Sequence, residues 1–101
     1  MASYLELYGL QNNDDLHHKI ATAVIVAADA IRTEDGAVVN HANRLLWARA
    51  AFESPLTIAQ HVMWAVLAAN KDATVANILA ATDSSIQTAV DNVIDVFANG
   101  A

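Results

Sequence analysis

Glycine and proline, the residues that most often interrupt helices, are scarce in this chain: its 101 residues include three glycines and one proline. Alanine, which has the highest helix propensity, occurs 22 times. Apolar residues recur at spacings of three and four, and no segment shows the convincing apolar–polar alternation of a half-buried strand. The sequence therefore predicts an all-α protein, a compact bundle of four main helices plus one or two short helices, in a single helical domain over residues 1–101.

Polar residues that can cap helices mark the expected boundaries. The four main helices are expected over about 14–33, 41–53, 55–70 and, from the TDSSIQ segment onward, 82–99; short helices are expected within 3–9 and 75–81. Pro55 fits the first position of its helix, where the missing N–H costs nothing. The expected N-terminal caps are Asn13, Asn40, Ser54, Thr74 and Ser84, and Ser84 has Gln87 at capping-box spacing.

Charge and composition exclude several classes of protein. The formal net charge is −6, and no basic residue follows Lys71, so the surface as a whole repels a phosphate backbone and no specific nucleic-acid binding is expected. The absence of cysteine excludes disulfides and cysteine-ligated zinc. No apolar run approaches the roughly 20 residues of a membrane span, and 1–10 does not resemble a signal peptide. No membrane partner is therefore expected.

Histidines and acids provide the few candidates for chemistry. Asp14 and His18 share a helix face beside His17, but zinc needs three or four convergent ligands, so solvated side chains in the first turns of a helix explain this pattern better than a metal site. His61 could act as a general base or occupy a core or interface position, but no serine or cysteine nucleophile lies at motif spacing. We expect no cofactor, no metal site and no enzymatic activity.

The remaining candidate is a protein-interaction surface. Trp47 lies between two arginines, and Trp and Arg are enriched where interfaces concentrate binding energy. The alternative is that Trp47 belongs to the core while Arg49 pairs with Glu53 four residues on. A second tryptophan follows on the 55–70 helix. The candidate interface residues are Arg44, Trp47, Arg49, His61 and Trp64.

The chain also has more apolar residues than a small monomer is expected to bury. They make up 55% of the sequence, against about 45–50% in ordinary domains. In the 14–33 helix, Val24, Ile25, Val26 and Ala28 widen the apolar stripe to nearly the whole circumference, which predicts burial on most sides, at the centre of the fold or against a second subunit. The last helix carries an apolar stripe that ends at Phe97. The stripe of the 14–33 helix consists of Leu16, Ile20, Ala23, Ala27 and Ile31.

Four segments, NHANRLLWA, MWAVLAANKDATV, ATDSSIQTAVD and VFANG, resemble a group of small proteins that tailed bacteriophages encode among their head and tail structural genes. The leading SYLELYGLQNNDDLHHKIATAVIVAADAI fits the start of the same group, so the resemblance covers most of the chain. It implies a structural virion protein, a head–tail connector or adaptor that acts through protein–protein contacts in an oligomeric ring. A capsid-associated protein also fits.

The partners implied by the resemblance are other copies of the chain and other virion proteins, namely portal, capsid or tail. The implied location is the virion, and the host cytoplasm during assembly. The group has no catalytic signature and supplies no site residues. The residues leave one alternative function, a small soluble helical interaction module, such as a regulator or inhibitor, that binds one protein partner.

Overall fold

The computed structural model describes residues 4–10, 13–69 and 74–99, and within these ranges every regular element is a helix. The prediction of an all-α bundle with four main and two short helices is confirmed, and the predicted boundaries agree with the observed ones to within about two residues. Asn70, expected to end the fourth helix, lies outside the described residues. In chain order the helices are α1 (Tyr4–Leu10), α2 (Asp14–Arg32), α3 (His41–Glu53), α4 (Pro55–Ala69), α5 (Val75–Leu79) and α6 (Asp83–Asn99).

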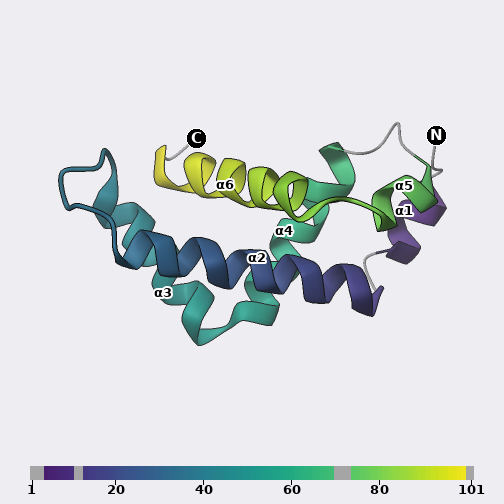
Figure 1. Cartoon of the computed structure of the whole chain (residues 1–101), viewed down its shortest axis with the longest axis horizontal. Helices are drawn as coiled ribbons and strands as arrows, with labels where there is room; N and C mark the ends of the chain where they lie inside the picture. Colours follow the sequence, from purple (N-terminus) through teal and green to yellow (C-terminus); the bar gives the residue numbers. More distant parts are fainter. Residues whose placement is uncertain (1–3, 11–12, 70–73, 100–101) are drawn as a thin grey trace.

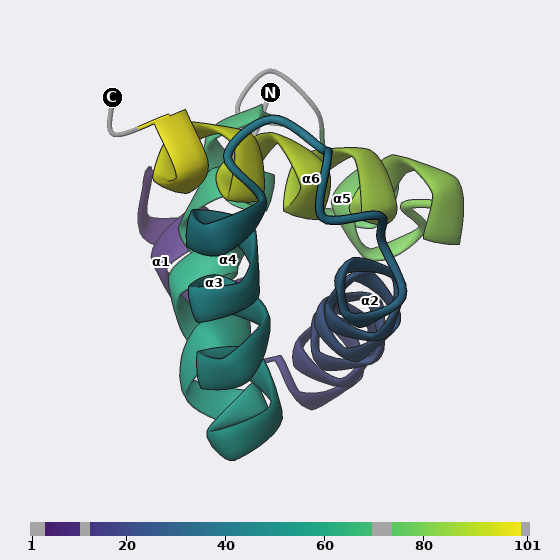
Figure 2. The ribbon, with the colours of Figure 1, turned by 90° about the vertical axis from the view of Figure 1, so that its left-hand side faces the viewer.

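Helix α2 is the centre of the arrangement because it packs against α3, α4 and α6. Helices α2 and α6 lie side by side and run in the same direction, while α3 and α4 form a V whose point is the junction at Ser54 (Figure 1). Viewed from one end, α6 crosses the top of the molecule, with α2 beneath it on one side and α3 and α4 on the other (Figure 2). The core lies between these three sides.

The buried face of α2 follows the predicted stripe, whose five members are all at most 7% exposed. The expectation that α2 is enclosed on most sides is only partly met. Val24 and Ala28 are buried, but Ile25 and Val26 remain 43% and 54% exposed, because the neighbouring helices cover a single broad side of α2. Two β-branched side chains of the central helix therefore face solvent in the isolated chain.

The buried face of α6 also follows its predicted stripe, except at its end. Ile86, Val90 and Ile94 are buried, whereas Phe97 is 49% exposed, so the expectation of a buried Phe97 is wrong. The reason is that the last turn of α6 packs through Ala98, whose carbonyl oxygen accepts a hydrogen bond of 2.9 Å from Asn43 Nδ2. Ala98 continues the buried row of Ile86, Val90 and Ile94 at a spacing of four residues, and Phe97 lies beside that row.

Two of the expected helix caps are confirmed. The side chain of Asn13 accepts a hydrogen bond of 2.9 Å from the Leu16 amide at the start of α2. The Thr74 hydroxyl accepts one of 3.2 Å from the Asn77 amide at the start of α5. Both side chains compensate amides that have no partner within the first helical turn.

Two other expected caps are wrong. Asn40 precedes α3 in a left-handed conformation (φ 59°), so its side chain does not cap that helix and instead donates to Asn99 Oδ1 at 2.5 Å. Ser84 lies inside α6, because the helix begins one residue earlier, at Asp83. The Thr82 hydroxyl caps α6 by accepting from the Ser85 amide at 3.1 Å. Thr82 and Ser84 are two residues apart, and the position at which the helical backbone begins determines which hydroxyl can cap α6.

Thr82 and Ser84 provide a matched test of this capping arrangement. We expect Thr82→Ala to lower the free energy of unfolding by about 1 kcal/mol, because an amide of α6 loses its acceptor. Ser84→Ala is expected to change it little, since the exposed Ser84 side chain is inside the helix, where alanine is well tolerated. Urea denaturation of both variants measures the difference, and equal losses would contradict the assignment of Thr82 as the cap.

Candidate functional site

The polar residues with catalytic or metal-binding potential are dispersed. Among the described residues, no group of three His, Asp or Glu side chains is placed to hold a metal ion. His17 Nε2 lies 3.3 Å from the Leu56 carbonyl oxygen, so this imidazole joins α2 to the start of α4. His61 is exposed on α4. None of the helices in the described ranges is both long and apolar enough to cross a bilayer.

The distinctive feature of the surface is its content of large apolar side chains. Single exposed apolar residues are ordinary, but clusters of them mark interaction sites. Trp64 is 49% exposed and Leu56 is 63% exposed, although both lie on a helix whose opposite side is part of the core. The exposed large apolar side chains are Leu5, Ile25, Val26, Val38, Val39, Leu45, Leu46, Phe52, Leu56, Trp64, Leu79, Val96 and Phe97.

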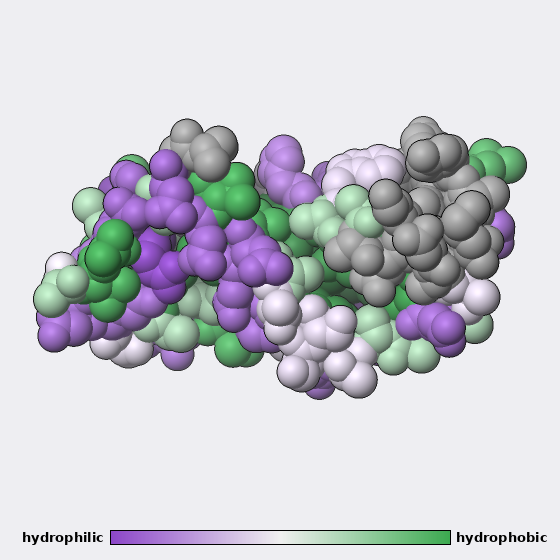
Figure 3. Space-filling view, turned by 90° about the horizontal axis from the view of Figure 1, so that it is seen from above, coloured by the Kyte–Doolittle hydropathy of each residue, from purple (hydrophilic) through white to green (hydrophobic). Residues whose placement is uncertain are grey.

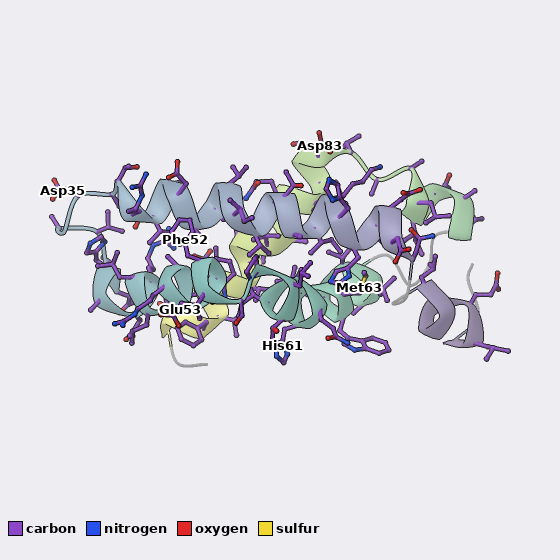
Figure 4. All side chains as sticks on the ribbon, turned by 90° about the horizontal axis from the view of Figure 1, so that it is seen from below. Asp35, Phe52, Glu53, His61, Met63 and Asp83 are labelled. Carbon is purple, nitrogen blue, oxygen red and sulfur yellow. The ribbon has the colours of Figure 1, made fainter. Side chains whose placement is uncertain are left out.

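Several of these side chains lie on the consecutive helices α3 and α4. The two helices are separated by Ser54 alone and lie end to end beside α2 when seen from below, with His61 projecting from the edge away from α2 (Figure 4). Leu46 and Arg49 on α3, and His61 and Trp64 on α4, are exposed positions three residues apart, so each pair lies on one side of its helix, while Phe52 and Leu56 are exposed near the junction of the two helices. We define the α3–α4 face as the exposed residues Leu46, Arg49, Phe52, Leu56, His61 and Trp64.

The structure separates the predicted interface residues into two groups. Arg49, His61 and Trp64 are exposed and belong to the α3–α4 face. Trp47 is 5% exposed and forms part of the core, which is the alternative that its sequence context had left open. Arg44 is half-buried on the inner side of α3. The predicted pair between Arg49 and Glu53 is present, with 3.3 Å between Nε and Oε1. The interface role of these residues stays a prediction.

The Arg44 side chain takes part in an ion-pair network and is not freely exposed at the surface. Its guanidinium binds both carboxylate oxygens of Glu34, one of them at 3.0 Å from Nε, and lies 3.5 Å from Asp95 Oδ1. The hydrogen bond from Arg44 lowers the pKa of Glu34, against the opposing effect of burial, and the same bond raises the pKa of Arg44. His41 Nδ1 lies 3.6 Å from Glu34 Oε2 and has no hydrogen-bond partner among the described residues.

This network fastens the 33–40 turn to the C-terminal part of α6. Glu34 comes from the turn, Arg44 from α3 and Asp95 from α6, so three separate segments meet at one guanidinium. Seen from above, hydrophilic residues predominate at this end of the molecule (Figure 3). The end with the 33–40 turn is therefore polar, and its charged side chains pair with one another. We call this network the clamp at the 33–40 turn; it holds three segments together and offers little apolar surface to a partner.

Sequence reasoning missed Leu46, Phe52 and Leu56 as surface residues. The available signal was that apolar residues occur all round α3, whereas the residues buried in it are Trp47, Ala48 and Ala51. Alanines let the other helices approach closely on that side, and the bulkier side chains remain outside.

No model of a known protein family matches this chain, and comparison with curated proteins and with solved structures gives no significant match.

Proposed function

We propose that this protein acts by protein–protein contact as a self-associating structural component, in the role of a head–tail connector or adaptor in the virion of a tailed phage. The observation that supports self-association is the exposure of three large apolar side chains, Leu46, Leu56 and Trp64, on the consecutive helices α3 and α4. Each is already about half covered in the single chain, so burying the rest against another subunit contributes about 1–2 kcal/mol per side chain. The assignment to a phage particle is supported by the sequence resemblance.

The composition of the α3–α4 face fits a protein interface. Its aromatic residues supply large apolar areas, and Arg49 and His61 supply polar contacts at its edge. The exposed positions form a helical surface that a helix or a second α3–α4 pair can cover. A catalytic cleft is not needed for this function.

The mass of the protein in solution tests self-association directly. We expect a mass that is a multiple of the 10.7 kDa chain and that increases with protein concentration. The double variant Leu56→Gln/Trp64→Gln is expected to lose most of the oligomer and keep its helical circular dichroism, since both side chains are exposed in the single chain. Light scattering coupled to gel filtration measures the mass, and far-UV circular dichroism measures the helix content.

Val39→Gln is the matched control, because Val39 is 79% exposed but lies in the turn before α3, outside the α3–α4 face. It should leave the oligomer unchanged. A wild-type chain that stays monomeric at every concentration would contradict self-association. Absence of the chain from purified particles of the virus that encodes it would contradict the connector role and favour the interaction-module alternative.

A further inference from the structure

The outer side of α3 carries a stripe of exposed side chains that is mostly apolar and contains one charge of each sign. At roughly 100° per residue, its members lie within about 120° of the helix circumference, on the side opposite the buried Trp47, Ala48 and Ala51. The three large apolar members are 39–59% exposed in the single chain. The members of this α3 stripe are Leu45, Leu46, Arg49, Phe52 and Glu53.

The charged members of the α3 stripe are paired with each other but keep open positions. Arg49 Nε lies 3.3 Å from Glu53 Oε1, and the two side chains are 78% and 66% exposed. The other guanidinium nitrogens and the second carboxylate oxygen have no hydrogen-bond partner among the described residues. An exposed pair four residues apart adds little to the stability of its own helix. A second subunit can therefore share this pair without a large loss of stability in the first.

Charge separates the α3 stripe from the exposed apolar side chains of α4 and α6. Helix α4 exposes Leu56 and Trp64 but contains no Asp, Glu, Lys or Arg. Helix α6 exposes Val96 and Phe97, but its only charged residues are three aspartates, so two copies of α6 would repel each other. The α3 stripe offers a second copy of the chain both apolar surface and charges of opposite sign.

We infer that two copies of the chain pair through their α3 stripes, with the helices antiparallel and related by a two-fold axis that passes between the levels of Arg49 and Glu53. Each Arg49 then faces the partner's Glu53 in addition to its own, so four charges alternate in sign. Such a contact is isologous: it closes on itself and joins subunits in pairs. This inference rests on the proposed self-association, and it names the surface and the symmetry by which two subunits associate.

The apolar members of the stripe fit this register. Phe52 lies within one residue of the level of the axis, so the rings of the two copies meet at the centre of the contact, where aromatic side chains contribute most. Leu46 comes close to the start of the partner's α4, since α3 and α4 lie end to end (Figure 4). Helix α3 is about 20 Å long, so the contact is smaller than the standard interface of about 1,600 Å², and the pairing is expected to be weak and dependent on concentration.

Reversal of one charge at a time tests this pairing. Arg49→Glu makes both charges of the stripe negative, and Glu53→Arg makes both positive. We expect each variant alone to associate about tenfold more weakly than the parent, because the attraction across the axis becomes repulsion. An equal mixture of the two should recover the association of the parent, since a negative stripe then faces a positive one. Light scattering measures the masses, and native mass spectrometry identifies pairs that contain one chain of each kind.

The matched control uses the ion pair of Asp29 and Arg32 on α2, whose side chains are 59% and 66% exposed. Arg32→Glu and Asp29→Arg change the net charge by the same amounts as the two α3 variants. Both should keep the mass of the parent and show no preference for mixed pairs. Mixed pairing by the α2 variants, or an unchanged mass of the α3 variants alone, would overturn the assignment of the contact to α3.

Leu46→Gln gives a second measurement that changes no charge. It should lower the oligomer mass and keep the helical circular dichroism of the parent, because Leu46 is 59% exposed in the single chain. An unchanged mass of this variant would overturn the α3 contact even if the charge variants fold poorly. An oligomeric parent whose α3 variants all keep its mass would overturn the α3 contact and leave self-association standing. A monomeric parent would overturn both proposals together.

Discussion

Replacement of Trp47 by alanine is expected to lower the free energy of unfolding by about 3–5 kcal/mol. The indole is 5% exposed and packs in the core with Ala48 and Ala51, so its removal leaves a cavity that alanine neighbours cannot fill. Small domains are stable by only about 5–15 kcal/mol in total, and each kcal/mol changes the Tm of a domain of this size by about 4–8 °C. Trp47→Ala should therefore melt far below the parent chain.

Trp64→Ala is the matched control for this result. The second tryptophan is 49% exposed, so its truncation is expected to cost the monomer a small fraction of the Trp47 effect. Thermal denaturation followed by circular dichroism should be carried out at a concentration where the chain is monomeric, since loss of self-association would otherwise lower the Tm of the Trp64 variant. Equal destabilisation by the two substitutions would contradict the separation of one indole into the core and the other onto the surface.

The pair between Arg44 and Glu34 is expected to contribute more to stability than any other ion pair in the described residues. Both side chains are about one-fifth exposed, and the guanidinium binds both carboxylate oxygens. A double-mutant cycle with Glu34→Gln and Arg44→Gln should give a coupling energy of about 1.5–3 kcal/mol, the range for hydrogen bonds to charged groups.

The exposed pair between Arg49 and Glu53 serves as the internal comparison for that cycle. Its side chains are 78% and 66% exposed, and exposed pairs four residues apart on a helix contribute about 0.3–0.5 kcal/mol. A coupling energy for Arg44 and Glu34 no larger than that of this surface pair would show that the clamp at the 33–40 turn adds nothing to stability.

The pair between Arg44 and Glu34 also makes the free energy of unfolding depend on pH, with a defined sign. The pKa of Glu34 is lower in the folded chain than its ordinary value of 4.5, mainly because Arg44 hydrogen-bonds the carboxylate. The folded state therefore binds this proton less readily than the unfolded state. The stabilisation from this pair is complete when the pH is above the ordinary pKa of 4.5. It is lost as the pH falls below 4.5 and through the lowered pKa of the folded chain. His41 and Asp95 lie beside this pair and also titrate, so the free energy of unfolding should be measured against pH for both the parent chain and Glu34→Gln. We expect the variant to lose less stability than the parent as the pH falls below 4.5.

Much of the fold could be predicted from the sequence. The buried stripe of α2 lies at helical spacings, and a helix presents residues at those spacings on one side, so this part of the core is determined locally. Asn13 and Thr74 precede their helices as caps, and the boundary at Ser54–Pro55 is fixed by the restricted backbone of proline. These features depend on residues that are near one another in the chain.

The surface was decided only by tertiary packing. Trp47 and Trp64 are equally apolar, and only the positions of α2 and α6 determine that one ring is enclosed and the other is left outside. Asn40 pairs with Asn99 across 59 residues, and Arg44 selects Glu34 and Asp95 over nearer partners. Local spacing thus determined the helices and their caps, while contacts between distant segments determined which apolar side chains remain available to other subunits.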